Sequence, residues 1–254
     1  MTKKSHGLIL IAIITLTSFS YDSEKTFNLG NRTCKISIVG QDEKFAKFIS
    51  LHDNENTSVD AFLEIKPSLP NCRLYELTQN DERLLKYEIK GKIYSFDPNR
   101  IFSSIGIKGT IIKYNQTHPQ ELENGLSLFA DSLLKTINLK NPDCYIVAIH
   151  NNNNNDFSVL SYKNSKDAEE VYVNGTQDID NFFIVTTKSD FDYFKDKKRN
   201  VVLQSINAKD DGSLSIYCQK NKLPYINIEA EHGQKAEQIK MIKETYSLIK
   251  NKTK

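Results

Sequence analysis

Residues 144–150 read Cys-Tyr-Ile-Val-Ala-Ile-His, an almost unbroken apolar run that ends in a histidine. Such a run is typical of a strand that is buried on both faces of a sheet. The same type recurs at 182–186 (FFIVT), 201–204 (VVLQ) and 225–228 (YINI). Strands of this kind are usually parallel, because helices cover both faces of their sheet. The sequence therefore predicts an α/β fold with a mixed, mostly parallel sheet.

Segments with helical spacing alternate with these runs. Apolar residues recur every three or four positions along 121–139, and helices are also predicted at 58–65 and 235–248. Neither an internal repeat nor a Pro- or Ser-rich linker divides the chain, so we predict a single domain with helices on both faces of the sheet. The remaining predicted elements are shorter strands at 35–39, 45–51, 83–89 and 92–96.

The composition is that of an ordinary globular protein. The 254 residues include 34 Lys and Arg against 32 Asp and Glu, which gives a formal net charge of +2, and the mean hydropathy is −0.50. These values exclude a disordered chain, and no excess of positive charge points to nucleic acid as a partner. The length is sufficient for one large core.

The first twenty residues have the pattern of an export signal. Two lysines precede the apolar run 7–16 (GLILIAIITL), and small residues suited to cleavage follow it. The run is shorter than the roughly 20 apolar residues of a transmembrane helix. We therefore predict a signal peptide over 1–20 and a mature domain over 21–254 that is periplasmic or secreted and has no transmembrane segment. An uncleaved membrane anchor is the alternative.

The four cysteines are widely spaced and contain no Cys-x-x-Cys pair. This spacing does not suit a zinc knuckle or a redox motif. One or two disulfides would be consistent with an oxidising compartment. Buried free thiols are the alternative, because a chain of this size does not need covalent cross-links. The cysteines are Cys34, Cys72, Cys144 and Cys218.

The first candidate site residues, His52 and Glu55, directly follow the apolar run 45–51. An imidazole and a carboxylate at this spacing can hold one metal ion from a single turn of backbone, although a solvated polar loop would look the same. His150 strengthens the first interpretation, because it also ends a buried strand, and ligands collect at the carboxyl ends of strands in open α/β sheets. A catalytic zinc needs three protein ligands, which these three residues would supply.

The second candidate is the turn Asp97-Pro98-Asn99-Arg100. Pro98 stiffens the turn, so that Asn99 and Arg100 bring an amide and a guanidinium fork to one place. The fork suits bidentate binding of a carboxylate. A structural arginine that bridges the turn to a surface acid is the alternative.

The third candidate is a pair of acids, Glu229 and Glu231, at the end of a strand that is otherwise suited to burial. A buried carboxylate is costly unless it is paired or lies beside a metal. One of the two is therefore a candidate general base. An edge strand that leaves the core for solvent is the alternative.

Taken in order, these motifs resemble the zinc carboxypeptidases of the funnelin (M14) type over about residues 47–233. The resemblance implies a carboxypeptidase-like fold. It also implies one Zn²⁺ ion with His52, Glu55 and His150 as its protein ligands and water in the fourth position.

The resemblance implies roles for the other candidates as well. Asn99 and Arg100 would hold the terminal carboxylate of the substrate. Arg83 lies about where the family keeps the arginine that polarises the scissile carbonyl. Glu229, preferred over Glu231, would be the general acid and base.

The chain departs from the family pattern in three places. The run 99–102 reads NRIF, which keeps only part of the family's motif. The tyrosine that often closes over the substrate has no clear counterpart, and Tyr217 is a better candidate than Tyr225. The acids of the run 210–213 (DDGS) would suit a substrate with an amino group, but the same run is also an ordinary turn.

The sequence thus predicts an exported zinc metallocarboxypeptidase that removes a C-terminal residue from peptides. Peptidoglycan stem peptides with a free C-terminal carboxylate are the substrates that a bacterial envelope would offer. Deacylation of an N-acyl amino acid, as in the related succinylglutamate desuccinylase and aspartoacylase branch, is the alternative reaction. A binding module that holds carboxylate ligands without turnover is the alternative from another functional class.

Overall fold

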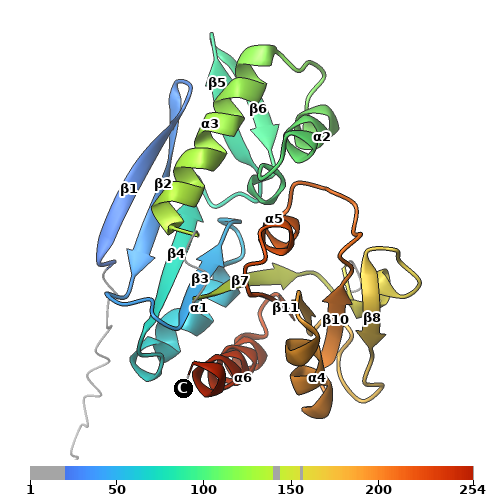
Figure 1. Ribbon diagram of the computed structural model, residues 1–254. Helices are drawn as coiled ribbons and strands as arrows, with labels where there is room; N and C mark the ends of the chain where they lie inside the picture. Colours follow the sequence, from blue (N-terminus) through green and yellow to red (C-terminus); the bar gives the residue numbers. More distant parts are fainter. Residues whose placement is uncertain (1–20, 140–143, 155–156, 254) are drawn as a thin grey trace, which may run out of the picture.

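The computed structural model describes residues 21–139, 144–154 and 157–253 (Figure 1). The predicted signal peptide over 1–20 lies outside the described residues. Within the described ranges, no helix combines the length and the apolar character needed to cross a membrane.

Within these ranges, nine strands form one mixed sheet. Its four central strands, from β4 to β11, are parallel to one another, and the antiparallel pairs lie outside them. The predicted α/β fold is therefore confirmed, with the parallel pairs concentrated at the centre. In spatial order the strands are β1 (Ser23–Leu29), β2 (Arg32–Val39), β4 (Cys72–Thr78), β3 (Ala46–Ser50), β7 (Tyr145–Asn152), β11 (Tyr225–Glu231), β9 (Phe182–Val185), β10 (Asn200–Gln204) and β8 (Ala168–Tyr172).

Helices cover both faces of the sheet, as predicted (Figure 1). One face packs against α1, α4 and α6 in a cluster that includes Phe48, Ile149 and Ile228. The other packs against α2, α3 and α5 in a cluster that includes Ile49 and Ile146. The helices are α1 (Asn56–Ile65), α2 (Ser104–Tyr114), α3 (Gln120–Ile137), α4 (Lys188–Asp196), α5 (Leu214–Lys220) and α6 (Lys235–Lys252).

Side-chain alternation along the central strands decides which residues face the candidate site. In β11, Ile226 and Ile228 pack into the cluster of α1, α4 and α6, which leaves Asn227 and Glu229 on the opposite face. The same alternation in β7 places His150 on that face, directly opposite Glu229 in the register of the two strands. The carboxyl ends of β7 and β11 thus present polar side chains on the α5 side of the sheet.

A separate hairpin of β5 (Leu85–Ile89) and β6 (Lys92–Phe96) extends from the sheet beside α2 and α3 (Figure 1). The pairing around Gly91 was predicted, but the first strand begins two residues later than expected, so Arg83 precedes it. Short 3₁₀ helices complete the described structure. They are η1 (Lys66–Ser68), η2 (Pro98–Arg100) and η3 (Val159–Tyr162).

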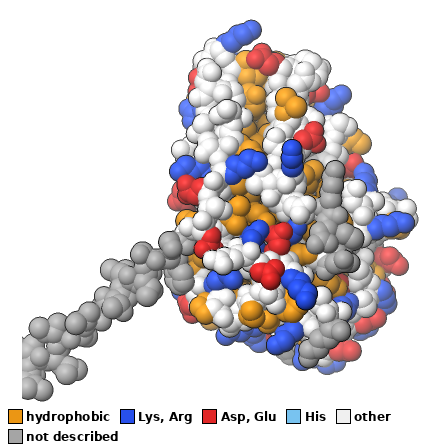
Figure 2. Space-filling view, turned by 60° about the vertical axis from the view of Figure 1, so that its left-hand side comes forward, with side chains coloured by type: hydrophobic (Ala, Val, Ile, Leu, Met, Phe, Trp, Pro, Cys, Tyr) orange, Lys and Arg blue, Asp and Glu red, His pale blue; other side chains and the backbone are white. Residues whose placement is uncertain are grey.

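The four cysteine side chains are buried and free, which answers the open question about disulfides in favour of free thiols. On the surface, Figure 2 shows Lys, Arg, Asp and Glu side chains interspersed across the face in view, with apolar side chains between them. This mixture accords with the nearly balanced formal charge of the chain.

Candidate metal centre and active-site cavity

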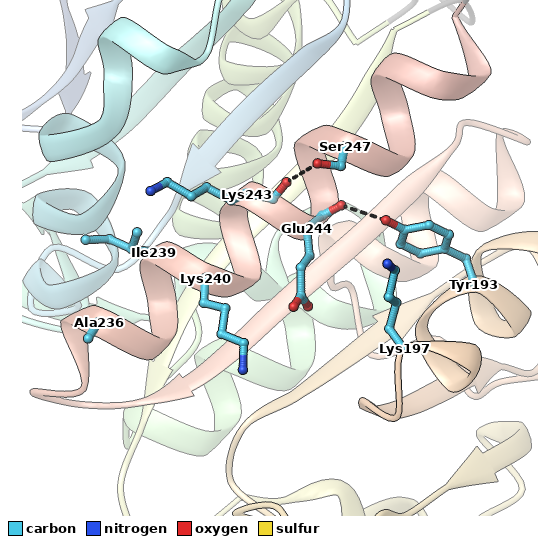
Figure 3. A pocket seen from close by; sticks show the side chains of 8 residues that line it. All are labelled: Tyr193, Lys197, Ala236, Ile239, Lys240, Lys243, Glu244 and Ser247. Atoms are coloured by element: carbon cyan, nitrogen blue, oxygen red, sulfur yellow. Dashed lines mark hydrogen bonds between the residues drawn. The ribbon is translucent and has the colours of Figure 1, made fainter.

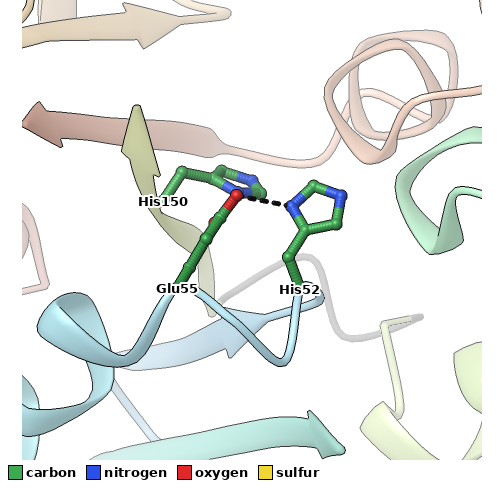
Figure 4. Close-up of side chains that lie close together, drawn as sticks. All are labelled: His52, Glu55 and His150. Atoms are coloured by element: carbon green, nitrogen blue, oxygen red, sulfur yellow. Dashed lines mark hydrogen bonds and ion pairs between the residues drawn. The ribbon is translucent and has the colours of Figure 1, made fainter. Parts of the chain in front are cut away.

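The side chains of His52, Glu55 and His150 converge at the carboxyl ends of β3 and β7 (Figure 4). One ligand atom from each lies within 4.8 Å of the others. Glu55 bridges the two imidazoles, with Oε1 at 2.8 Å from Nδ1 of His52 and Oε2 at 2.7 Å from Nδ1 of His150. None of the three residues is more than 3% exposed. His150 is 95 positions away from Glu55 in the sequence, and the fold brings it to His52 and Glu55.

The local backbone explains how His52 and Glu55 share one site. β3 ends at Ser50, and the turn that follows leads directly into α1. The N–H of Glu55 donates to the carbonyl of His52 at 3.1 Å, which closes the turn and places both side chains on one side. Glu55 is also the residue immediately before α1, where the helix dipole favours a negative charge.

The charges within the cluster shift its pKa values. Burial opposes protonation of His52, but the carboxylates of Glu55 and Asp97 outweigh this effect and raise its pKa to about 9. Burial alone would raise the pKa of Glu55, but the neighbouring imidazoles lower it well below its usual value. Glu55 therefore stays ionised, which is the state in which a carboxylate binds a metal ion, whereas His52 has to lose a proton when a metal ion binds.

The donor set fits a divalent metal ion. Nε2 of His52 lies 2.9 Å from Oδ1 of Asp97, which orients the ring so that Nδ1 faces Glu55 and His150. Among the described residues, Nδ1 of His52 has no partner in good hydrogen-bond geometry, although it is buried. Two imidazoles and one carboxylate form a known ligand set of catalytic zinc, and a carboxylate behind a ligating histidine is its usual outer partner.

Replacing Asp97 by Ala is expected to weaken metal binding by about 10- to 100-fold, because the ring of His52 loses the partner that orients it. Competition with a chromophoric chelator measures the affinity. Asp211→Asn is the matched control, since Asp211 lines the same cavity but does not contact His52. Equal affinities of the wild type and a folded Asp97→Ala variant would contradict the assignment of His52 as a ligand.

The cluster opens into a cavity of about 440 Å³. Residues from several loops and strand ends line it, among them the three candidate metal ligands, Asn99, both candidate arginines and Glu229, but not Glu231 or Tyr217. The lining residues used below are His52, Glu55, Arg83, Asn99, Arg100, His150, Asn152, Tyr162, Ile184, Asp211, Tyr225, Asn227, Glu229 and His232.

Arg83 lies beside the cluster of His52, Glu55 and His150. Its Nη1 is 2.6 Å from Oε1 of Glu55, and its Nη2 is 3.9 Å from Oδ2 of Asp97. The Arg83 side chain is 47% exposed, so its guanidinium faces both the cluster and the solvent of the cavity. A cation in this place can stabilise negative charge that develops on a reacting oxygen.

Asn99 and Arg100 lie in η2 at another side of the cavity. Oδ1 of Asn99 accepts a hydrogen bond from the backbone N–H of Leu214 at 2.9 Å, which leaves the amide N–H groups as its donors. Nε of Arg100 lies 3.6 Å from Oδ2 of Asp211. Arg100 therefore makes the bridge to an acid that the sequence left as the alternative, and it lines the cavity as well.

The two candidate bases differ in their placement. Glu229 is buried, lines the cavity and accepts a hydrogen bond at Oε1 from Nδ2 of Asn227 at 2.9 Å. Burial raises the pKa of Glu229. Glu231 instead accepts a hydrogen bond from Gln234 and does not line the cavity. The geometry therefore favours Glu229.

The tyrosines are arranged differently from the expectation. Tyr217 packs on Phe102 with ring centroids 6.1 Å apart and lines another hollow, so it does not face the cluster. Tyr225 lines the cavity but is almost fully buried. Tyr162 of η3 also lines the cavity, and no sequence pattern pointed to it. Asn227 was also overlooked, although a polar residue inside the run YINI was a usable signal.

A second hollow of about 370 Å³ lies between α4 and α6 (Figure 3). Its one lining carboxylate, Glu244, is paired with Arg199 at 2.6 Å. The lining contains neither histidine nor cysteine, so we assign no chemistry to this hollow. Its residues are Tyr193, Lys197, Ala236, Ile239, Lys240, Lys243, Glu244 and Ser247.

Comparison with protein-family models and with curated proteins found no match. Solved structures that match include the murein-tripeptide amidase MpaA from Escherichia coli O157, with a TM-score of 0.47 and 8% identity over 93% of each chain. Bovine thrombin-activatable fibrinolysis inhibitor, solved with tick carboxypeptidase inhibitor, has a TM-score of 0.46 and 14% identity over 91% of this chain and 92% of that one.

A succinylglutamate desuccinylase/aspartoacylase from Rhodobacter sphaeroides has a TM-score of 0.43 and 11% identity over 91% of this chain and 67% of that one. This last name is that of the branch which the sequence analysis gave as the alternative reaction. At such TM-scores and identities, the likeness does not assign an activity to this chain.

Proposed function

We propose that this protein is a zinc-dependent carboxypeptidase, a hydrolase that removes the C-terminal residue from peptides. The proposal rests on the set of side chains that line one cavity. Three side chains that could hold a metal ion, a buried carboxylate and an arginine suited to a carboxylate all line it. Amide hydrolysis needs an activated nucleophile, a proton carrier and a stabiliser of the oxyanion, and this cavity offers residues for each.

The residues around the metal would have separate roles in hydrolysis. His52, Glu55 and His150 would hold a zinc ion, which when bound supplies Lewis acidity that polarises a carbonyl and lowers the pKa of water to about 7. Oε1 of Glu229 is engaged by Asn227, so Oε2 is the oxygen that would accept a proton from the attacking water. The same oxygen would then deliver that proton to the leaving amine.

The two arginines would act at the two ends of the scissile unit. Arg83, beside Glu55, would donate N–H groups to the oxygen on which negative charge develops. Arg100 would hold the free carboxylate of the residue that leaves, which restricts cleavage to the end of a chain. Its contact with Asp211 is long and partly exposed, so a substrate carboxylate can compete for it.

The proposed substrate class follows from the proposed export. A signal peptide over 1–20 would place the domain over 21–254 in the periplasm or outside the cell. The abundant peptides with free carboxylates in a bacterial envelope are peptidoglycan stem peptides. We therefore include these peptides in the proposal as the substrate to test first.

Replacing Arg100 by Met is expected to raise KM for peptides with a free C-terminal carboxylate by about 100-fold, because the substrate carboxylate loses its charged partner. Steady-state kinetics on matched peptide acids and peptide amides measures the effect. The peptide amides, which lack the charge, should be affected far less. Arg73→Met, which removes an arginine paired with Glu43 outside the cavity, is the control. Equal losses on acids and amides would rule out this role of Arg100.

The function itself is tested by incubating the zinc-loaded protein with carboxyl-terminated peptides, muropeptides and N-acyl amino acids, with and without chelator. Mass spectrometry should show the loss of single C-terminal residues only in the samples that contain no chelator. Processing of N-acyl amino acids alone would identify a deacylase. Binding of carboxylate ligands without any turnover would identify a binding module.

A further inference from the structure

Asn227 is a polar residue in the middle of the buried strand β11. It is only 6% exposed, and it lines the cavity on the same face of the sheet as Glu229. In the register of the sheet it lies opposite Ile184 of the antiparallel strand β9. A polar side chain in such surroundings needs hydrogen-bond partners for both ends of its amide.

Among the described residues, only one end of the Asn227 amide has a partner. Nδ2 donates to Oε1 of Glu229 at 2.9 Å. A general base must be ionised, and an ionised carboxylate can only accept hydrogen bonds, so in the proposed function the amide nitrogen faces Glu229 and Oδ1 faces away from it. Within the described part of the chain, no donor reaches Oδ1. A buried acceptor without a donor is costly, so Oδ1 marks a position where a bound molecule can donate.

The neighbours of Asn227 in the cavity define which kind of donor fits. Ile184 and Tyr225 are nearly fully buried, and the Ile184 side chain and the Tyr225 ring supply apolar surface. Tyr162 adds a hydroxyl, and burial raises its pKa, so this hydroxyl stays protonated and uncharged. A charged ammonium group would lose its hydration here, and a purely apolar group would leave Oδ1 unpaired. An uncharged polar group is the best match.

We propose that Asn227 determines specificity by accepting, at Oδ1, a hydrogen bond from an uncharged N–H group in the side chain of the leaving residue. A carboxamide, as in glutamine, is the chemical class that fits. This inference rests on the proposed function, in which Arg100 holds the carboxylate of that residue and Glu229 lies beside the scissile bond. The side chain of the leaving residue then extends toward the remaining walls around Ile184.

The first arm of the test measures binding without turnover. Free glutamine, methionine and glutamate are titrated calorimetrically into the zinc-loaded protein. They have similar lengths but differ in the N–H group and in charge. The wild type is expected to bind glutamine about tenfold more tightly than either of the others, the factor expected from one neutral hydrogen bond. Asn227→Leu should abolish this preference.

The second arm compares kcat/KM for peptides that end in glutamine or methionine, where the same preference and its loss in the variant are expected. Asn152→Leu is the matched control. Asn152 is another buried asparagine of the cavity with an unpaired Oδ1 among the described residues, but it lies beyond His150 at the end of β7. The Asn152→Leu variant should leave the preference for glutamine unchanged. Asn227→Thr keeps a hydrogen-bond donor for Glu229, and it replaces Asn227→Leu in the test if that variant does not fold.

The outcomes separate the two proposals. A wild type that binds the three amino acids equally overturns the role of Asn227. An equal fall in turnover on every peptide, with the binding preference intact, also overturns it and makes Asn227 a positioning residue for Glu229. A preference for glutamine in binding without cleavage of any peptide supports the pocket and refutes the proposed function.

Discussion

Glu229→Gln is expected to lower kcat by about 100- to 10,000-fold on every substrate that the wild type hydrolyses, with the bound metal retained. Glutamine has nearly the same size and can still accept the hydrogen bond of Asn227 through its amide oxygen. It cannot take up a proton, so the attacking water and the leaving amine lose their proton carrier. Steady-state kinetics together with elemental analysis of the purified variant gives both readings.

Glu231→Gln is the matched control for this prediction. Glu231 is two residues away on the same strand, but it accepts its hydrogen bond from Gln234 and does not line the cavity. We expect nearly unchanged turnover. If Glu231→Gln eliminates turnover instead, the general base lies two residues further along the chain. If both variants remain active, neither carboxylate carries the proton.

His150→Ala is expected to abolish both metal binding and hydrolysis. The loss of affinity should exceed the 10- to 100-fold loss typical of an outer partner, because only two of the three protein ligands remain. Glu55 also loses the partner at Oε2, so thermal unfolding must be measured alongside. Metal content by mass spectrometry and turnover by steady-state kinetics report the effect.

His232→Ala controls for the loss of a histidine from the same cavity. His232 lines the cavity but is not part of the cluster of His52, Glu55 and His150. The His232→Ala variant should therefore keep its full metal content. A folded His150→Ala variant that still binds one ion and hydrolyses peptides would contradict the proposed ligand set.

The candidate site could be predicted because strand ends are visible in a sequence. His52 follows one apolar run and His150 ends another, and parallel strands bring their carboxyl ends to one edge of the sheet. The direct pairing of β3 with β7 could not be derived from either run, since the chain between them includes a hairpin and three helices. The resemblance implied only that His52, Glu55 and His150 hold one ion, and the structure places their side chains together.

Other features depend on contacts that no local pattern encodes. Strand β4 was overlooked because Arg73 and Glu76 interrupt its apolar residues. In the structure these side chains find partners in distant segments, with Arg73 contacting Glu43 and Glu76 accepting from Tyr21. The orientation of the Asn227 amide likewise depends on Glu229, and Tyr162 reaches the cavity from a segment without periodicity.

The most direct test of the central claim is anomalous diffraction at the zinc absorption edge from crystals of the zinc-loaded protein. We predict one strong peak at bonding distance from Nδ1 of His52, Nδ1 of His150 and a carboxylate oxygen of Glu55. A zinc-loaded crystal without a peak among these three side chains, or with its zinc bound elsewhere, would contradict the proposed metal centre.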